Sequence, residues 1–202
     1  MPDILNKIDE SPAFNNKGVT CFKSVLNYVD SGAFFHAPVW WLYVLLGVFS
    51  ALAPFYLLFD FFIPMFKHMN AWPIIVSIVA WVVMLACGLV KFLLWWNRKD
   101  QLAALAPVGD DFPVTPIFAH FNRTLGEWLG FTVGVEFFLV SLIVFLLAGG
   151  DARRLLPVSG LGMIFALPVA GFVIIFASRF VSEIIRALAA IAVNTKKTAD
   201  KA

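Results

Sequence analysis

The sequence predicts an all-α, polytopic membrane helical bundle with four transmembrane helices, both termini in the cytoplasm and an amphipathic C-terminal helical extension. Hydrophobic residues make up 61% of the 202 residues and charged residues only 14%, whereas about a quarter of the residues in a soluble domain are charged. Two further observations support this fold class: the chain has four long apolar runs, and its basic residues are distributed to one side of them. We therefore expect the lipid bilayer to be the main environment of this chain.

Three segments follow from the apolar runs. They are a cytoplasmic N-terminal segment (1–38), a four-helix transmembrane domain (39–182) and a cytoplasmic C-terminal helix and tail (183–202). The predicted spans cover residues 39–59, 72–96, 125–148 and 155–177, with each close to the 20 or so apolar residues that a membrane helix needs.

Prolines refine two of these elements. Pro54 is expected to kink the first span, because a proline inside a helix removes one backbone donor. Thr115 followed by Pro116 is a typical helix start, so the sequence predicts a short interfacial helix over 117–122 that leads into the third span.

Basic residues predict the orientation, because Lys and Arg near span ends are retained in the cytoplasm. Of the 15 lysines and arginines, only Lys67, Arg153 and Arg154 fall on the side opposite the two termini. Both termini are therefore expected in the cytoplasm. Helical spans also favour an inner (cytoplasmic) membrane over an outer membrane that carries β-barrels.

Several function classes are disfavoured by composition. The net charge is +2 and no basic stripe is present, so we expect no nucleic-acid partner. Cys21 and Cys87 are too few for a disulfide framework or a CxxC metal site. No HExxH, GxSxG, P-loop or dinucleotide-binding motif occurs in the sequence. We accordingly expect no catalytic residues, no metal, no cofactor and no enzymatic activity.

Small residues predict where helices pack closely. Gly126, Gly130 and Gly134 form a GxxxGxxxG row in the third span, and the fourth span offers a stripe of Gly162, Ala166 and Ala170. In lipid, close backbone contact over small residues is a main source of helix association. The row could pack inside one bundle or form a seam between copies that surrounds a pore. Contact with the fourth span of the same chain would remove the main support for a pore.

Glu136 is a candidate buried polar residue near the middle of the third span, and Thr132 shares its helix face one turn earlier. A carboxylate at this depth is expensive and is a functional-site hypothesis by default. Glu136 could be a protonatable group in an ion path, or a protonated carboxyl that ties two helices together.

Lys91 and Glu127 are expected to lie at similar depth, roughly one turn inside the cytoplasmic interface. A salt bridge would offset part of the burial cost of each charge. Alternatively, Lys91 reaches the lipid headgroups and Glu127 forms a capping box with Thr124.

Helical periodicity continues past the fourth span through Ile184, Leu188 and Ile191. This extension could dock a cytoplasmic partner, lie on the membrane surface or pack against the N-terminal segment. The first functional hypothesis is a non-enzymatic subunit or adaptor of a membrane complex, which binds itself or another membrane protein. The alternative is a small oligomeric channel or membrane-disrupting effector with Glu136 near the conduction path.

Overall fold

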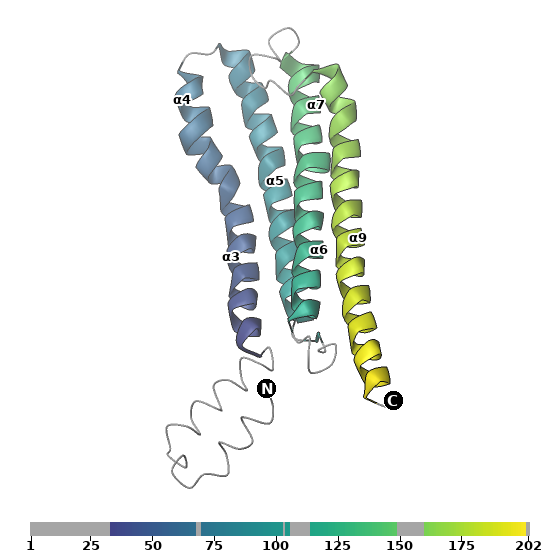
Figure 1. Ribbon diagram of the computed structural model, residues 1–202. Helices are drawn as coiled ribbons and strands as arrows, with labels where there is room; N and C mark the ends of the chain where they lie inside the picture. Colours follow the sequence, from purple (N-terminus) through teal and green to yellow (C-terminus); the bar gives the residue numbers. More distant parts are fainter. Residues whose placement is uncertain (1–32, 68–69, 103, 106–113, 149–159, 201–202) are drawn as a thin grey trace, which may run out of the picture.

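The computed structural model describes residues 33–67, 70–102, 104–105, 114–148 and 160–200, and this part of the chain contains helices and no strands. The helices form four roughly parallel columns (Figure 1). Their elements are α3 (Ala33–Leu57), η2 (Leu58–Phe62), α4 (Ile63–Phe66), α5 (Ala71–Leu102), α6 (Thr115–Phe131), η3 (Thr132–Glu136), α7 (Phe137–Ala148) and α9 (Leu161–Ala199). The prediction of an all-helical chain with four long helices is confirmed.

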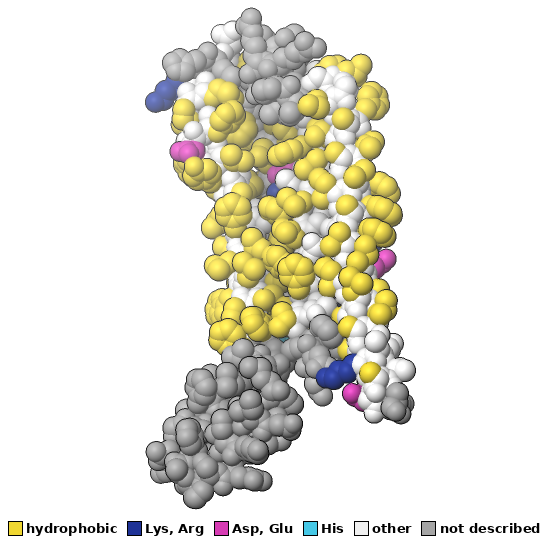
Figure 2. Space-filling view, viewed as in Figure 1, with side chains coloured by type: hydrophobic (Ala, Val, Ile, Leu, Met, Phe, Trp, Pro, Cys, Tyr) yellow, Lys and Arg dark blue, Asp and Glu magenta, His cyan; other side chains and the backbone are white. Residues whose placement is uncertain are grey.

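Each column is long and apolar enough to cross a membrane. The candidate spans are Phe34–Phe66, Ala71–Leu102, Thr115–Ala148 and Leu161–Ala199. The visible face of the bundle carries mainly hydrophobic side chains between its two ends, with only a few charged ones (Figure 2). This arrangement is that of a multi-pass membrane protein, in which lipid covers an apolar exterior.

Two columns contain a π-helical turn. In the first, η2 follows Pro54, and the N–H of Ile63 donates to the carbonyl of Leu58 five residues earlier. In the third, the N–H of Phe137 likewise donates to the carbonyl of Thr132. A π-helical turn accommodates an extra residue in the helix, so it changes which side chains face a neighbour.

The first two columns pack closely where Gly88 of α5 meets Ser50 and Pro54 of α3. A Cβ atom on Gly88 would lie only 2.8 Å from the carbonyl oxygen of Ser50. The indole N–H of Trp81 donates to the carbonyl of Pro54 at 2.8 Å, slightly further along the same contact. Small residues and a tryptophan anchor therefore hold α3 against α5.

An apolar core lies toward the end of the bundle that carries α4 and α7. It consists of buried residues from all of the first three columns: Phe62, Val76, Ala80, Met84, Val140 and Val144. At the edge of this end, the indole of Trp72 donates to the carbonyl of Leu147 at 2.8 Å. This half of the bundle is therefore held mainly by apolar contacts, and the polar contacts gather in the other half.

The observed helices are longer than the predicted spans. Residues 117–122 are helical and lead into the third span, as expected, but they form no short helix of their own, because Thr115–Ala148 is one continuous helical column. The fourth helix continues without a break from Leu161 to Ala199. The N-terminal segment 1–32 and the first predicted residues of the fourth span, 155–159, lie outside the described residues.

Candidate functional site

A buried ion pair lies in the interior of the bundle. The Nζ atom of Lys91 on α5 donates to Oε2 of Glu136 at 2.5 Å, and the two side chains are only 6% and 4% exposed. Glu136 is about 18 Å along the helix from the end of α7, by the rise of an α-helix, so the pair is deep within the span. Each charge offsets the desolvation of the other.

The π-helical turn η3 positions Glu136. Glu136 is the last residue of this turn, and it is buried together with Gly134. Turns of this kind frequently occur at functional sites, because the extra residue redirects a side chain. Here the redirected side chain is the carboxyl that meets Lys91.

Thr132, which was expected to share a polar face with Glu136, makes its hydrogen bond within its own helix. Its hydroxyl donates to the carbonyl of Trp128 at 2.9 Å. The ammonium of Lys91 lies 6.0 Å from the centre of the Trp128 ring, at the outer limit of a cation–π contact. The Trp128 ring and the Cys87 thiol therefore both lie near the ion pair.

A second polar cluster surrounds Glu127 on α6. Its Oε2 accepts from Arg98 of α5 at 2.6 Å, and its Oε1 accepts from Arg179 of α9 at 2.8 Å and from Arg123 of α6 at 3.2 Å. Glu127 is 10% exposed, whereas Arg98, Arg123 and Arg179 are 21%, 39% and 48% exposed. One carboxylate thus joins three helices at the edge of the bundle interior.

The expected pairing of Lys91 with Glu127 is not the one in the structure. Lys91 pairs with Glu136 instead, and Glu127 pairs with the three arginines. Glu136 lies about 13 Å further along the column than Glu127, by the rise per residue. The long lysine stem carries its ammonium from the level of its own backbone into the bundle interior, so Lys91 meets the deeper carboxylate.

A third set of polar contacts links α3 to α6. The hydroxyl of Tyr43 lies 2.8 Å from Nδ1 of His120 and 3.5 Å from the hydroxyl of Thr124. The indole of Trp128 donates to the hydroxyl of Ser50 at 2.9 Å. These contacts satisfy polar groups that would otherwise be buried without partners.

The glycine row lies against α9 of the same chain. A Cβ on Gly130 would lie 2.7 Å from the carbonyl oxygen of Gly171, and a Cβ on Gly134 would lie 2.9 Å from the Cα of Gly171. Gly126 contacts Ser178. The bundle itself therefore occupies this row, and an oligomeric pore built on it loses its main support.

The stripe predicted on the fourth span is not the one that makes this contact. Gly162, Ala166 and Ala170 are exposed, and a Cβ on Gly162 would meet nothing within 4 Å. The buried positions on this helix are Ile164, Gly171, Ser182 and Ala189. The predicted stripe is therefore wrong, and the face of α9 that packs against the glycine row instead includes Gly171.

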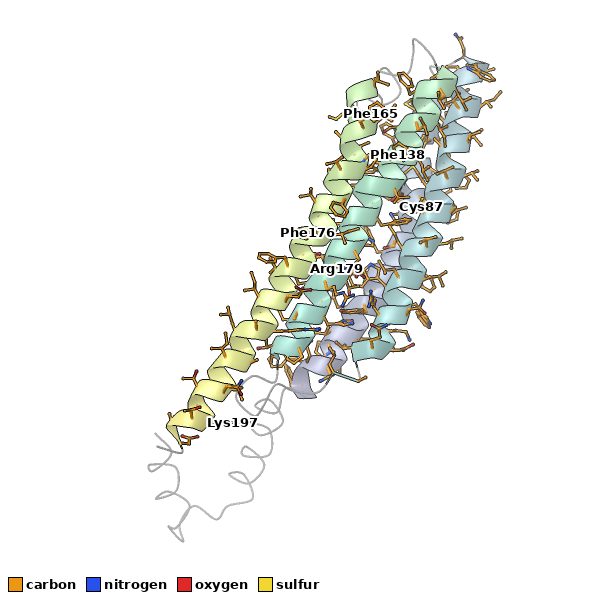
Figure 3. All side chains as sticks on the ribbon, turned by 90° about the vertical axis from the view of Figure 1, so that its right-hand side faces the viewer. Cys87, Phe138, Phe165, Phe176, Arg179 and Lys197 are labelled. Carbon is orange, nitrogen blue, oxygen red and sulfur yellow. The ribbon has the colours of Figure 1, made fainter. Side chains whose placement is uncertain are left out.

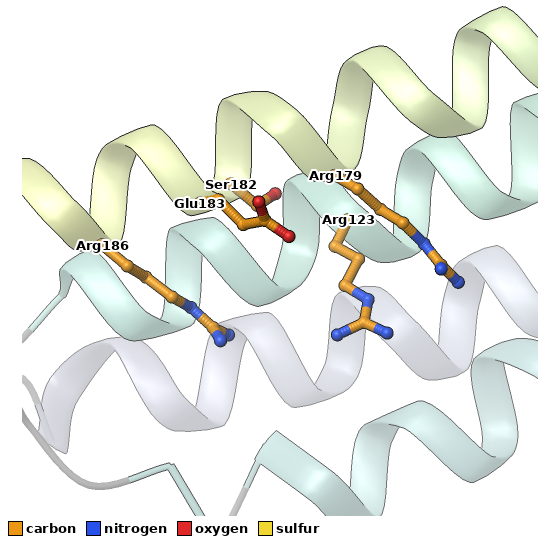
Figure 4. Close-up of a pocket in the computed structure, with 5 residues that line it drawn as sticks. All are labelled: Arg123, Arg179, Ser182, Glu183 and Arg186. Atoms are coloured by element: carbon orange, nitrogen blue, oxygen red, sulfur yellow. The ribbon is translucent and has the colours of Figure 1, made fainter.

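A small cavity lies beside the Glu127 cluster, between α6 and α9 (Figure 4). Its volume is about 130 Å³, and it is lined by Arg123, Arg179, Ser182, Glu183 and Arg186. Arg179 and Arg186 extend toward the same side, with Arg123 between them (Figure 4). Such a concentration of guanidinium groups favours an anion.

The sequence reasoning missed the arginines around Glu127. Arg123 and Glu127 are four residues apart on one helix, which is the spacing of an intrahelical ion pair and could have been recognised. Arg98 and Arg179 gave no comparable local signal, because their contact with Glu127 depends on how α5, α6 and α9 pack.

Comparison with known proteins gives no family, since the chain matches no protein-family model, no curated protein and no solved structure. The fold and these sites therefore define only a class of protein. The chain is all-helical and has four helices long and apolar enough to span a membrane, which is consistent with a multi-pass integral membrane protein.

Proposed function

We propose that this chain is a non-enzymatic integral membrane protein that serves as a subunit or adaptor of a membrane complex. Its two termini lie in the cytoplasm, and the C-terminal part of α9 is the surface that contacts a partner. A cytoplasmic (inner) membrane suits the distribution of basic residues. Self-association, where it occurs, uses a surface other than the glycine row.

The observation that carries this proposal is the length of α9. This helix has 39 residues, which is about 58 Å, whereas the hydrocarbon core of a bilayer is about 30 Å thick. Lys197 lies near the end of α9, beyond the lower ends of α5 and α6 (Figure 3). A substantial part of α9 must therefore lie outside the hydrocarbon core.

The far part of α9 combines exposed apolar and basic residues. Leu188 and Ile191 are each 61% exposed, and the helix carries Lys196 and Lys197 in its last turn. Apolar side chains that are exposed outside lipid commonly mark contact surfaces. This combination suits a helix that binds another protein at the membrane surface.

Two truncations test the adaptor role. Full-length protein and a variant lacking residues 183–202 are cross-linked in the membrane and purified in mild detergent, and the mass of each complex is measured. Because Ile185, Ala189 and Ala192 lie beside Thr115 of α6, the longer truncation also removes contacts within the bundle. Removal of 194–202 alone leaves these contacts in place, and thermal unfolding of both truncated forms separates lost folding from lost binding.

We expect a partner to copurify with the full-length protein at a fixed stoichiometry. The same partner should be lost with the longer truncation. A full-length protein that purifies as a lone monomer would contradict the adaptor role. Partner retention by both truncated forms would contradict the assignment of α9 as the contact surface.

Cysteine labelling tests the orientation. In a background with Cys21→Ser and Cys87→Ser, single cysteines are introduced as Lys197→Cys and Lys67→Cys at the two ends of the bundle. A membrane-impermeant thiol reagent should label Lys197→Cys only in inside-out vesicles and Lys67→Cys only in intact cells. Labelling of both from the same side would contradict the four-span arrangement.

The channel or membrane-disrupting alternative keeps one supporting observation, the buried carboxyl of Glu136. That carboxyl is already paired with Lys91 at 2.5 Å, and Gly130 and Gly134 already contact α9. Loss of conductance in a planar bilayer with Glu136→Gln would favour the channel over the adaptor.

A further inference from the structure

The cavity between α6 and α9 has an excess of positive charge. Arg98, Arg123, Arg179 and Arg186 lie in or beside it, and the opposing carboxylates are Glu127 and Glu183. Four guanidinium groups against two carboxylates leave a site that attracts an anion. Glu183 lines the cavity and reduces this attraction.

The arginines keep hydrogen-bond donors for a ligand. Arg123 binds Glu127 through Nε, and Arg179 binds it through one Nη atom. A guanidinium has five N–H donors, so each retains several that these bonds do not use. Within the described part of the chain, Arg186 has no salt-bridge partner. Forked donors of this kind match the oxygens of a phosphate group.

The site has the size of a headgroup rather than of a larger molecule. Its volume of about 130 Å³ is well below the 300 Å³ or so at which pockets for drug-sized ligands begin. A phosphate group that enters from the side of the bundle would fit between Arg123 and Arg186. The rest of such a ligand would lie outside the cavity, along the surface of α9.

An apolar path for acyl chains leads away from the cavity. Phe172, Phe176, Arg179, Glu183 and Arg186 follow one another at three- and four-residue spacing, so they share one face of α9. Phe172 and Phe176 are 69% and 62% exposed, and their rings are stacked 6.4 Å apart. Figure 3 shows Phe176 above Arg179 on this helix. A lipid with its phosphate at the arginines would lay its chains against these rings.

The level of the cavity agrees with a membrane surface. Ser178 contacts Gly126, so Arg179 lies beside Glu127, close to Trp128. Trp96 and Trp41, which are 42% and 59% exposed, occur in the same half of the bundle. Tryptophan is enriched at the boundary between hydrocarbon and headgroups.

We infer that the cavity lined by Arg123, Arg179 and Arg186 binds the phosphate of an anionic phospholipid in the cytoplasmic leaflet. The inference rests on the membrane orientation under the proposed function and needs no protein partner. Basic pockets between transmembrane helices on the cytoplasmic side are suited to anionic headgroups.

Native mass spectrometry of the purified full-length protein tests this site. Phosphatidylglycerol and phosphatidylcholine are titrated separately, and the dissociation constant of the first bound lipid is measured. Phosphatidylglycerol should bind more tightly, since only this lipid carries a net negative charge. Inorganic phosphate at equal concentration should not displace it, because the acyl chains contribute to binding.

Three charge variants refine the test, each with its folding checked by thermal unfolding. Arg186→Gln should weaken the binding of phosphatidylglycerol about fivefold, and Glu183→Gln should strengthen it about fivefold, as expected for one charge near a headgroup. Lys197→Gln removes one positive charge from the same helix outside the cavity, and it should leave the binding nearly unchanged.

Equal affinity for the two lipids would overturn the inference, as would equal losses with Arg186→Gln and Lys197→Gln. Displacement by inorganic phosphate would assign the site to a free anion and overturn the lipid assignment. None of these outcomes bears on whether α9 binds a protein partner, so the two proposals fail separately.

Discussion

Lys91 and Glu136 form an ion pair at 2.5 Å in the interior of the bundle, and it joins α5 to the π-helical turn of the third column. Because both side chains are almost fully buried, removal of one partner leaves the other charge without compensation. The pair therefore couples the position of α5 to the geometry of η3.

A double-mutant cycle measures this coupling. Lys91→Met and Glu136→Gln should each lower the free energy of unfolding by about 3–5 kcal/mol, because each strands a buried charge. The double variant should recover much of this loss, since neither charge remains. Thermal and denaturant unfolding in detergent provide the measurement, and strictly additive losses would show that the pair is not coupled.

Contact between Gly134 and Gly171 predicts a steric effect. Gly171→Ala places a methyl group against the backbone of Gly134, so it should lower the free energy of unfolding by about 1–3 kcal/mol through overpacking. Gly162→Ala on the same helix is the matched control, because nothing lies within 4 Å of its added Cβ. Equal stability of the two variants in detergent would exclude this contact as a close helix seam.

Glu127 should matter more than any one of its partners. Glu127→Gln weakens three charged hydrogen bonds together, and we expect a loss of about 1.5–3 kcal/mol in the free energy of unfolding. Arg179→Gln should cost less than 1 kcal/mol or so, because the Arg179 side chain is 48% exposed and the other two arginines still bind Glu127. A larger effect of Arg179→Gln in unfolding measurements would contradict the central role of Glu127.

Removal of the Tyr43 hydroxyl is expected to lower the stability of the protein, and a second tyrosine provides the comparison. Tyr43→Phe keeps the ring but leaves buried His120 without its 2.8 Å partner, so we expect a loss of about 1–3 kcal/mol. Tyr56→Phe removes a hydroxyl that bonds to the exposed Asp60, on a residue that is itself 66% exposed, so it should cost much less than Tyr43→Phe. Differential scanning fluorimetry of the two variants compares them directly, and equal melting temperatures would argue against a structural role for the Tyr43 hydroxyl.

The four long helices could be predicted because a membrane span needs only about 20 apolar residues, and this signal is local in sequence. Burial of Glu136 was predictable for the same reason, from its place within an apolar run. Its partner was not. The place of Lys91 in its span predicts a depth near that of Glu127, whereas its long side chain reaches Glu136.

The packing faces were only partly predictable. The row of Gly126, Gly130 and Gly134 was correctly identified as a set of small residues for close contact, but the partner face on α9 is centred on Gly171 instead of Gly162, Ala166 and Ala170. Several faces of α9 carry small residues, so spacing alone could not select one. In the third column, the π-helical turn η3 also changes which side chains face a neighbour. A projection that assumes a regular α-helix therefore misplaces the residues that follow Phe131.

The unbroken length of α9 has a mechanical consequence. From Arg179 to Ala199 this helix is about 30 Å long, by the rise of an α-helix. A rotation of only about 10° around the level of Arg179 would therefore displace its far end by about 5 Å. The bond between Glu127 and Arg179 and the packing of Ile185 and Ala189 beside Thr115 of α6 both hold the near part of this helix, so a rearrangement of these contacts would be amplified at its far end.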